Sequence, residues 1–249
     1  MMTPGDVHVW TFSLMQGSRQ IRELTLCLDP SERSRSERFY FDHLKRRFIV
    51  RHAFLRHILA RYLSLSASDL QFDQNAYGKP RLSARCNHAD LRFNLSSSGE
   101  WGVLACMYGQ DLGIDIEEQR LMVERDQLVG DFFSAQEIIQ WEKLSDYDKD
   151  NAFFIGWTRK EAYIKALGLG LSLDLKSFSV SFDENEDHLL SGDNDKWRLV
   201  PFLTAPNYRA CVACPQQAKT LSFFHIPELG GDDMFKNVQS LNKVVFLDR

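Results

Sequence analysis

The chain has 249 residues, of which 44% are hydrophobic and 26% charged, so it is long enough for one large or two smaller globular domains. With a formal net charge of −4 and no run of about 20 apolar residues, it is expected neither to bind nucleic acid in general nor to span a membrane. Five scattered cysteines and an amino terminus without a basic and then apolar segment favour a cytoplasmic protein without disulfide bonds.

A strand and then a long helix are predicted in the first part of the chain. Apolar and polar residues alternate over Asp6–Leu14, which is typical of a strand. Pro30 and Ser31 predict a helix start with Ser31 as the N-cap. A long helix ending near Leu63 is predicted by residues spaced three and four apart: Phe48, His52, Leu55, Leu59 and Tyr62.

The segment from Glu32 to Arg61 contains nine Lys or Arg and three acidic residues. A basic segment in a chain that is acidic overall suits a local site for an anionic small ligand, although a solvated helix face would look the same.

The rest of the chain is predicted to contain strands and two further helices. Asn75–Pro80 has the composition of a turn, and Ser134 followed by Glu137 has the pattern of a helix capping box. Helices are expected over Ser134–Leu144 and Lys149–Leu167, and strands over Leu91–Leu95, Gly102–Tyr108, Leu112–Ile116, Ser177–Phe182, Trp197–Leu203, Tyr208–Cys214 and Leu221–Ile226. This order predicts an α+β protein of two halves, residues 1–110 and 111–249.

The segment Gly113-Ile114-Asp115-Ile116-Glu117 gives the first chemical signal. Alternate residues of a strand share a face, so Asp115 and Glu117 are expected to point one way and the two isoleucines the other. Two adjacent carboxylates repel each other unless a cation or a proton lies between them, which suits Mg²⁺ with its preference for oxygen ligands. The polar face of an exposed edge strand would give the same pattern.

A second signal lies on the predicted helix that ends near Leu167. Trp157, Glu161 and Lys165 are spaced four residues apart and therefore form one stripe. A surface Glu–Lys pair, worth about 0.2–0.5 kcal/mol, would explain the two charges but not the tryptophan in line with them.

Taken together, the two segments resemble the signature of the 4'-phosphopantetheinyl transferases, in their two-half Sfp type. The second segment has the form Trp157-x-x-Lys160-Glu161-Ala162-x-x-Lys165 and follows the first by about forty residues. Three more segments resemble motifs of this family: Tyr77-Gly78-Lys79-Pro80, Phe93-Asn94-Leu95-Ser96-Ser97-Ser98 and Phe132-Phe133-Ser134-x-x-Glu137. The resemblance covers roughly Pro30 to Phe182.

This resemblance implies a fold, a reaction and a partner. The expected fold is a pseudo-twofold pair of similar α+β halves in a monomer, with coenzyme A in the cleft between them. The expected reaction transfers the 4'-phosphopantetheine group of coenzyme A to a serine of an acyl or peptidyl carrier protein and releases 3',5'-ADP. Fatty acid, polyketide and nonribosomal peptide biosynthesis all use such carriers, and the sequence does not distinguish among them.

The resemblance also implies roles for individual residues. Asp115, Glu117 and Glu161 would hold Mg²⁺ against the pyrophosphate, and Lys165 would contact the pyrophosphate. Glu137 is the first choice for the base that takes the serine proton, with Glu161 as its rival. The residues expected to bind coenzyme A are Arg35, Arg47, Lys79, Pro80, Ser96, Ser97, Asp115, Lys160 and Lys165.

Two residues depart from the family pattern. Ser97 stands where the family usually has a histidine that is associated with the coenzyme A phosphates, and a hydroxyl carries no positive charge. We therefore expect weaker coenzyme A binding or compensation by a neighbouring base. Glu32 stands where related chains can carry a basic residue, which leaves Arg33 or Arg35 for the 3'-phosphate.

Two other functions stay open at this point. The departure at Ser97 is compatible with a catalytically impaired module that binds coenzyme A or a carrier protein, and the carboxylates are compatible with another Mg²⁺-dependent nucleotide enzyme. Cys211 and Cys214 have the spacing of a metal or redox motif, but without a second ligand pair and on a predicted strand they are expected to be buried structural thiols.

Overall fold

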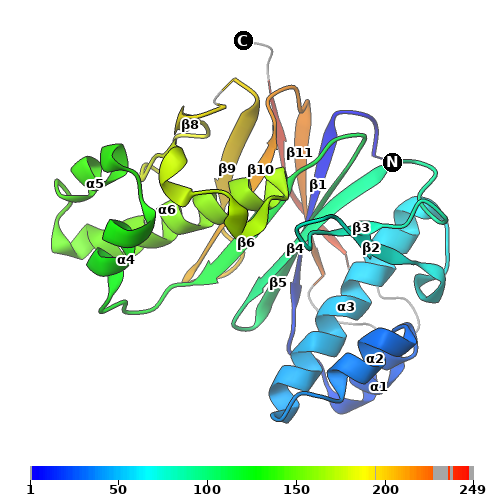
Figure 1. Ribbon diagram of the computed structural model, residues 1–249. Coiled ribbons are helices and arrows are strands. Elements are labelled where there is room, and N and C mark those ends of the chain that lie inside the picture. The colour runs from blue at the N-terminus through cyan, green and yellow to red at the C-terminus, as the bar shows by residue number, and fades with distance from the viewer. Residues whose placement is uncertain (1, 194, 227–234, 236–237, 247–249) are drawn as a thin grey trace.

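Two main β-sheets and the long helices packed on them form the body of the protein (Figure 1). The computed structural model describes residues 2–193, 195–226, 235 and 238–246. The helices are α1 (Ser18–Thr25), α2 (Pro30–Ser36), α3 (Asp42–Leu63), α4 (Arg125–Phe132), α5 (Ala135–Trp141) and α6 (Asp146–Leu167), with short 3-10 turns at Ala67–Asp69, Gly170–Ser172 and Leu175–Ser177. The strands are β1 (Asp6–Ser13), β2 (Phe72–Gln74), β3 (Pro80–Leu82), β4 (Leu91–Ser98), β5 (Trp101–Tyr108), β6 (Gly113–Glu118), β7 (Ser179–Val180), β8 (Leu189–Ser191), β9 (Trp197–Phe202), β10 (Tyr208–Pro215), β11 (Thr220–Ile226) and β12 (Gln239–Val245). The predicted α+β class is confirmed.

The two sheets lie between two long helices. The first sheet has the strand order β12-β11-β1-β5-β4 and the second β6-β10-β9. Side chains of a strand alternate between its faces, and β10 shows this directly: Val212 belongs to a cluster with residues of β1 and β5, whereas Cys211 belongs to a cluster with residues of α6. On the far side of the first sheet, Phe12 stacks on Phe54 of α3 with 4.5 Å between the ring centroids. The layers are therefore α3, first sheet, second sheet and α6.

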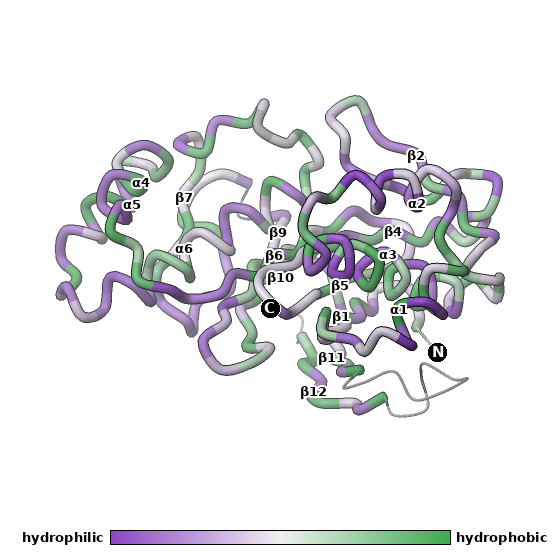
Figure 2. Tube along the Cα trace, turned by 90° about the horizontal axis from the view of Figure 1, so that it is seen from below, coloured by the Kyte–Doolittle hydropathy of each residue, from purple (hydrophilic) through white to green (hydrophobic). Residues whose placement is uncertain are grey.

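Smaller elements lie at the two ends of the molecule. Figure 2 shows α4 and α5 at one end and α1 and α2 at the other, with the sheets between them. None of the helices in the described part of the chain combines the length and apolar character that crossing a lipid bilayer requires.

The last two strands return to the first sheet. β11 pairs in parallel with β1, with Val9 opposite Phe223, and β12 pairs with the outer edge of β11. The division proposed near Gln110 falls in the connection between β5 and β6. It remains a proposal, and in spatial terms the first sheet also contains β11 and β12 from the second half of the sequence.

Side chains join the edges of the two sheets. The side-chain oxygen of Asn94 on β4 accepts a hydrogen bond from the backbone N–H of Ile114 on β6, at 2.8 Å. Ser98 Oγ accepts from the N–H of Glu118 at 3.1 Å. Because these contacts come from alternate residues of β4, one face of that strand is directed at β6.

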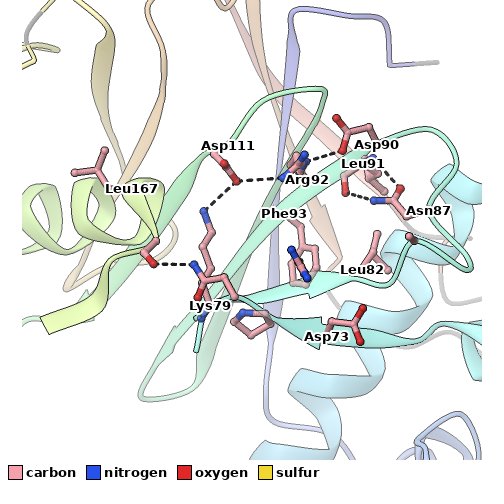
Figure 3. A pocket seen from close by; sticks show the side chains of 15 residues that line it. Asp73, Lys79, Leu82, Asn87, Asp90, Leu91, Arg92, Phe93, Asp111 and Leu167 are labelled. Atoms are coloured by element: carbon pink, nitrogen blue, oxygen red, sulfur yellow. Dashed lines mark hydrogen bonds and ion pairs between the residues drawn. The ribbon is translucent and has the colours of Figure 1, made fainter. Parts of the chain in front are cut away.

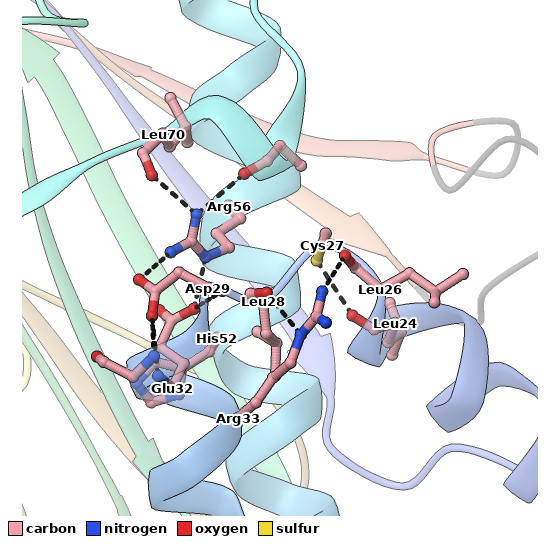
Figure 4. A network of polar contacts seen from close by, with 12 residues as sticks. Leu24, Leu26, Cys27, Leu28, Asp29, Glu32, Arg33, His52, Arg56 and Leu70 are labelled. Atoms are coloured by element: carbon pink, nitrogen blue, oxygen red, sulfur yellow. Dashed lines mark hydrogen bonds and ion pairs between the residues drawn. The ribbon is translucent and has the colours of Figure 1, made fainter.

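A buried arginine of α3 binds two acidic residues at the start of α2 (Figure 4). The guanidinium of Arg56 is fully buried and donates to the carboxylates of Asp29 at 2.6 Å and Glu32 at 2.7 Å. It also donates to the carbonyl oxygens of Ala67 and Leu70. A buried charge needs such partners, so Glu32, one of the departures from the family pattern, serves here as a counter-ion of the fold.

Most predicted elements are present, with one wrong cap and several omissions. The helix predicted to end near Leu63 does so, and Ser134 with Glu137 forms the predicted capping box. The N-cap of α2 is Asp29 rather than Ser31, since the Asp29 carboxylate accepts from the N–H groups of Ser31 and Glu32. The helices α1 and α4 and the strands β2, β3, β8 and β12 were not predicted.

Gly113 allows α6 to pack directly on β6. A methyl group at this position would lie 2.0 Å from the carbonyl oxygen of Ala162 and 2.4 Å from the backbone nitrogen of Ala166. Both atoms belong to the backbone of α6, so the helix would have to move away. The missing side chain at Gly113 therefore sets the distance between the strand and the helix that carry the predicted site.

We expect Gly113→Ala to destabilise the protein by about 1–3 kcal/mol, the usual cost of overpacking, and to reduce activity because α6 shifts. Gly130→Ala is the matched control, since a methyl group there meets no atom within 4 Å and lies on an exposed position of α4. Alanine is the better helix former, so the control should gain up to about 1 kcal/mol. Urea unfolding measures both changes, and equal stability of the two variants would contradict this account of Gly113.

Candidate active site

Asp115, Ser96 and Lys165 meet where β6, β4 and α6 come together. The side chain of Asp115 is almost completely buried, and its Oδ1 accepts hydrogen bonds from Lys165 Nζ and, at 2.9 Å, from Ser96 Oγ. Lys165 Nζ also donates to Ser96 Oγ at 3.1 Å. The second carboxylate oxygen, Oδ2, is buried and has no hydrogen-bond partner among the described residues. An unsatisfied buried carboxylate oxygen is costly, which suggests a site prepared for another cation or donor.

Two further carboxylates interact with Asp115 through their charges. Glu117 lies two residues further along β6 and accepts a hydrogen bond from Ser98 Oγ at 2.9 Å. Glu161 lies on α6, one turn before Lys165. Burial raises the pKa of all three carboxyl groups, and the charge of Asp115 raises the pKa of Glu117 and Glu161 further. The charge of Lys165 opposes these shifts at all three carboxyl groups, and the charge of Arg120 also opposes the shift at Glu117.

The three predicted metal ligands thus lie in one region. Asp115 and Glu117 come from β6 and Glu161 comes from α6, the strand and the helix in which the sequence placed them. Within the described ranges, however, no three His, Cys, Asp or Glu side chains are arranged as a metal-binding group. The donors themselves fit Mg²⁺, because they are carboxylate oxygens that repel one another and one of them, Asp115 Oδ2, lacks a partner. A role in metal binding therefore remains a proposal.

Glu137 and Lys160 form a buried pair away from this cluster. Glu137 is fully buried, and its carboxylate accepts from the N–H groups of Ser134 at 2.6 Å and Val180 at 2.8 Å. Lys160 Nζ lies 2.8 Å from Glu137 Oε2 and donates to backbone carbonyls that include that of Phe178. Both oxygens of Glu137 are occupied, and neither side chain reaches solvent. This geometry argues against the predicted roles of Glu137 as the base and of Lys160 as a coenzyme A contact.

Lys79 joins the turn between β2 and β3 to the end of α6 (Figure 3). Its Nζ donates to the carbonyl oxygens of Leu112 and Ala166, both at 3.1 Å, and to the carboxylate of Asp111 at 3.5 Å. Burial lowers the pKa of Lys79. Since these contacts occupy the three N–H donors, the amine connects the two halves, and the expected contact with coenzyme A would require it to leave them.

Pro80 begins β3 and lines a cavity of about 480 Å³ beside that turn (Figure 3). Asn75 donates to the carbonyl oxygen of Gly168 at 2.8 Å on one side of it, and Arg92 donates to Asp90 at 2.7 Å on the other. The cavity places Pro80 where a ligand could reach it, so its contact with coenzyme A stays a proposal.

Arginines surround a second cavity, of about 240 Å³, between α3 and the turn after β4. The charged and polar residues that line it are Arg47, Arg51, Ser97 and Ser98. Arg35 lies beside it, with its guanidinium 5.4 Å from the centre of the Phe48 ring. Arg33, the other candidate, instead donates to the backbone carbonyls of Leu26 and Leu28. Of the two, Arg35 is therefore the residue left to face an anion.

The sequence prediction missed Arg51. It lies four residues after Arg47, and residues at that spacing share a helix face. The same spacing could have found it, since the predicted helix contained both.

Cys211 and Cys214 have structural positions, as predicted, and so does His52. Both cysteines are fully buried on β10, and burial raises the pKa of their thiols. His52 stacks on Phe48 with 3.9 Å between ring centroids, and its Nδ1 lies 2.9 Å from the carbonyl oxygen of Phe48.

Known protein families match both parts of the chain. Residues 16–108 match the family model described as 4'-phosphopantetheinyl transferase, N-terminal, and residues 111–214 match that of the 4'-phosphopantetheinyl transferase superfamily. The chain is 33% identical to the 4'-phosphopantetheinyl transferase HetI of Nostoc sp. (strain PCC 7120) over 220 residues. The matched region covers 88% of this chain and 92% of that protein. Over 210 residues it is 34% identical to the 4'-phosphopantetheinyl transferase Sfp of Bacillus subtilis (strain 168), covering 81% and 89%.

The chain therefore belongs to the 4'-phosphopantetheinyl transferase family, a family of transferases, and the predicted family is confirmed. The similarity extends to a eukaryotic relative: the L-aminoadipate-semialdehyde dehydrogenase-phosphopantetheinyl transferase of Schizosaccharomyces pombe is 29% identical over 175 residues, 66% of this chain and 68% of that protein.

If Glu137 is structural, Glu137→Ala should destabilise the protein by about 3–5 kcal/mol, because it leaves the Lys160 ammonium buried without its partner. The double variant Glu137→Ala/Lys160→Met removes that charge and should recover much of the loss. Urea unfolding measures both effects. A Glu137→Ala protein of normal stability but without activity would restore Glu137 as the candidate base.

Stability should fall below neutral pH partly because of His52. Burial, followed by the charge of Arg51, lowers the pKa of His52 from 6.5 to about 4. Between these values the unfolded chain binds more protons than the folded one, so stability present above pH 6.5 is lost as the pH falls toward 4. His52→Gln should reduce that loss by at most about 3 kcal/mol. Urea unfolding of the parent and of His52→Gln at several pH values tests this, and identical pH profiles of the two proteins would contradict it.

Proposed function

We propose that this chain transfers the 4'-phosphopantetheine group of coenzyme A to a serine hydroxyl of an acyl or peptidyl carrier protein and releases 3',5'-ADP. Family membership gives the class of reaction. The observation that carries the proposal is the junction of Asp115, Ser96 and Lys165. Two more carboxylates, those of Glu117 and Glu161, lie close enough to interact with the charge of Asp115. Nothing in the comparisons supports the alternative of a catalytically impaired binding module.

We propose Asp115, Glu117 and Glu161 as the residues that would hold Mg²⁺. Their oxygens suit this hard cation. Burial and mutual repulsion make the ionised form of the three carboxyl groups unfavourable, and a bound cation would offset both effects. When bound, the ion supplies neutralisation of the pyrophosphate charge and orients it.

The other reacting parts follow from the remaining side chains. Lys165 is partly exposed and lies against Asp115, so its ammonium group can contact a pyrophosphate that reaches the same cluster. With both oxygens of Glu137 occupied, the role of proton acceptor passes to Glu161.

The nucleotide end of coenzyme A would lie toward the basic residues of the first half. Arg35 and Arg47 provide positive charge there, and Arg47 forms no ion pair with any residue in the described ranges. Pro80, at the turn between β2 and β3, is a further proposed contact and lies beside the cavity that it lines.

We further propose that the chain acts as a cytoplasmic monomer, because both halves of the cleft come from one polypeptide. Acidic helical carrier proteins are the expected partners, and charge complementarity would guide their docking. Fatty acid, polyketide and nonribosomal peptide carriers are all candidates.

The direct test incubates the purified chain with coenzyme A, Mg²⁺ and a panel of apo carrier proteins, and measures each carrier by mass spectrometry. We expect the mass of one phosphopantetheine to be added to at least one carrier. Asp115→Asn and Glu161→Gln should each lower kcat by at least about 100-fold, with thermal midpoints within a few degrees of the parent.

Glu142→Gln is the matched control, since this carboxylate is exposed at the end of α5 and should tolerate the change without loss of rate. Tight binding of coenzyme A without any mass gain would instead favour the impaired module. If ATP binds to the chain and coenzyme A does not compete with it, the result would favour a different nucleotide enzyme.

A further inference from the structure

The carboxyl end of α6 is held by the turn between β2 and β3 (Figure 3). The last carbonyl oxygens of an α-helix have no partner inside the helix and need donors from elsewhere. Here the carbonyl oxygen of Ala166 accepts from Lys79 Nζ at 3.1 Å, and that of Gly168, the C-cap residue, accepts from Asn75 Nδ2 at 2.8 Å. Two side chains from the first half of the chain therefore cap a helix of the second half.

Lys79 also holds the start of β6. The same Nζ donates to the carbonyl oxygen of Leu112 at 3.1 Å, and the next residue along the chain begins β6. Ala166 directly follows Lys165, and Leu112 precedes Asp115 by three residues. The ammonium group of Lys79 thus bridges the same helix and strand that Lys165 and Asp115 connect.

The position of this charge is unfavourable unless the bridge itself is useful. The Lys79 side chain is only 13% exposed, and burial lowers its pKa. The carboxylate of Asp111 lies 3.5 Å away and is itself 55% exposed, so it offsets little of the lost hydration. An apolar side chain of this length would fill the same space without that penalty, so a buried ammonium group directed at two backbone carbonyls indicates a requirement for this geometry.

We infer that Lys79 is a positioning residue of the transfer reaction, which holds Lys165 against Asp115 by bridging α6 and β6 and does not touch the ligand. This inference rests on the proposed function and deepens it. In that function Lys165 contacts the pyrophosphate, so a shift of the helix end moves the cation relative to the reacting phosphate. A misplacement of about 1 Å can lower a rate by about 100-fold.

The first test is the variant Lys79→Met, which keeps the length and the apolar packing of the side chain but removes its donors. We expect kcat in the transfer assay to fall by about tenfold to a hundredfold, because Lys165 is no longer fixed. Asn75 still holds the turn, so the KM for coenzyme A and the Kd for 3',5'-ADP, measured by calorimetry, should change by less than about twofold. Weaker nucleotide binding at an unchanged kcat would show a direct contact and overturn the inference.

A double-mutant cycle tests the path through Lys165. Lys165→Met alone should lower kcat, and adding Lys79→Met should lower it by less than about threefold more, because the residue being positioned is gone. If the two losses multiply instead, Lys79 does not act through Lys165 and the inference is wrong.

Lys149→Met is the matched control on the same helix. Lys149 is nearly as buried as Lys79, with 18% of its side chain exposed, and it connects the other end of α6 to Asp126 at 3.2 Å. The control should keep the kcat of the parent. An equal loss of kcat in both lysine variants would mean that Lys79 only stabilises the fold, which would also overturn the inference.

A spectroscopic measurement separates this inference from the proposed function. In protein whose lysines carry carbon-13 at the ε position, the NMR signal of Lys165 is assigned by its absence from Lys165→Met. Lys79→Met should displace this signal, and Lys149→Met should not. If the parent transfers nothing to any carrier but the signal moves, the proposed function fails and the positioning of Lys165 stands. If the parent transfers normally and Lys79→Met changes neither the signal nor kcat, the positioning role fails and the function stands.

If Lys79→Met does not fold, Lys79→Arg takes its place in these measurements. The guanidinium keeps the charge but presents its N–H groups in one plane, which does not match three oxygens around a single nitrogen. We expect a displaced Lys165 signal and a reduced kcat, and parent values of both in this variant would overturn the inference.

Discussion

The contact between the backbone of α6 and the strand β6 is the constraint on which the site depends. Because Gly113 has no side chain, the helix lies against the strand, and Lys165 reaches Asp115 across that contact. Ser96 completes the junction from the first sheet, so three segments far apart in the sequence share one charged cluster. The motif residues Gly113, Asp115 and Lys165 are thus linked by packing as well as by chemistry.

Buried charges in this protein fall into two kinds. Arg56 and Lys160 are buried and bond to carboxylates and backbone carbonyls, and they hold elements of the fold together. Arg51 and Asp115 have atoms that no described residue satisfies, and both adjoin the proposed path of the ligand. Arg159 is also buried with an unpartnered Nε, yet it donates to the backbone carbonyls of Ser181 and Glu186, so incomplete hydrogen bonding alone does not mark a functional charge.

This difference also explains how far the sequence could predict the structure. Periodicity and capping patterns located the long helices, and the alternation along β6 correctly placed Ile114 and Ile116 together in the core, although Asp115 on the opposite face is almost completely buried as well. The motif could not show that Glu137 and Lys160 satisfy each other inside the protein, because that depends on the 3-10 turn and strand that follow α6. Arg51 was not predicted, although it lies four residues after Arg47 and therefore on the same face of the predicted helix; only its contact with Ser97 depends on a segment distant in sequence. Short elements such as α1 and β12 had too few periodic residues to be recognised.

The return of β11 to the side of β1 affects how the chain can fold. The first sheet cannot be completed until residues near position 220 have been synthesised, since β1 lies between β5 and β11. Such long-range parallel pairing is slow, and an amino-terminal fragment made alone would leave one edge of β1 open to other chains. Because this strand comes from the second half of the sequence, the two parts of the chain depend on each other for a complete first sheet, and separate expression of the first part would favour aggregation.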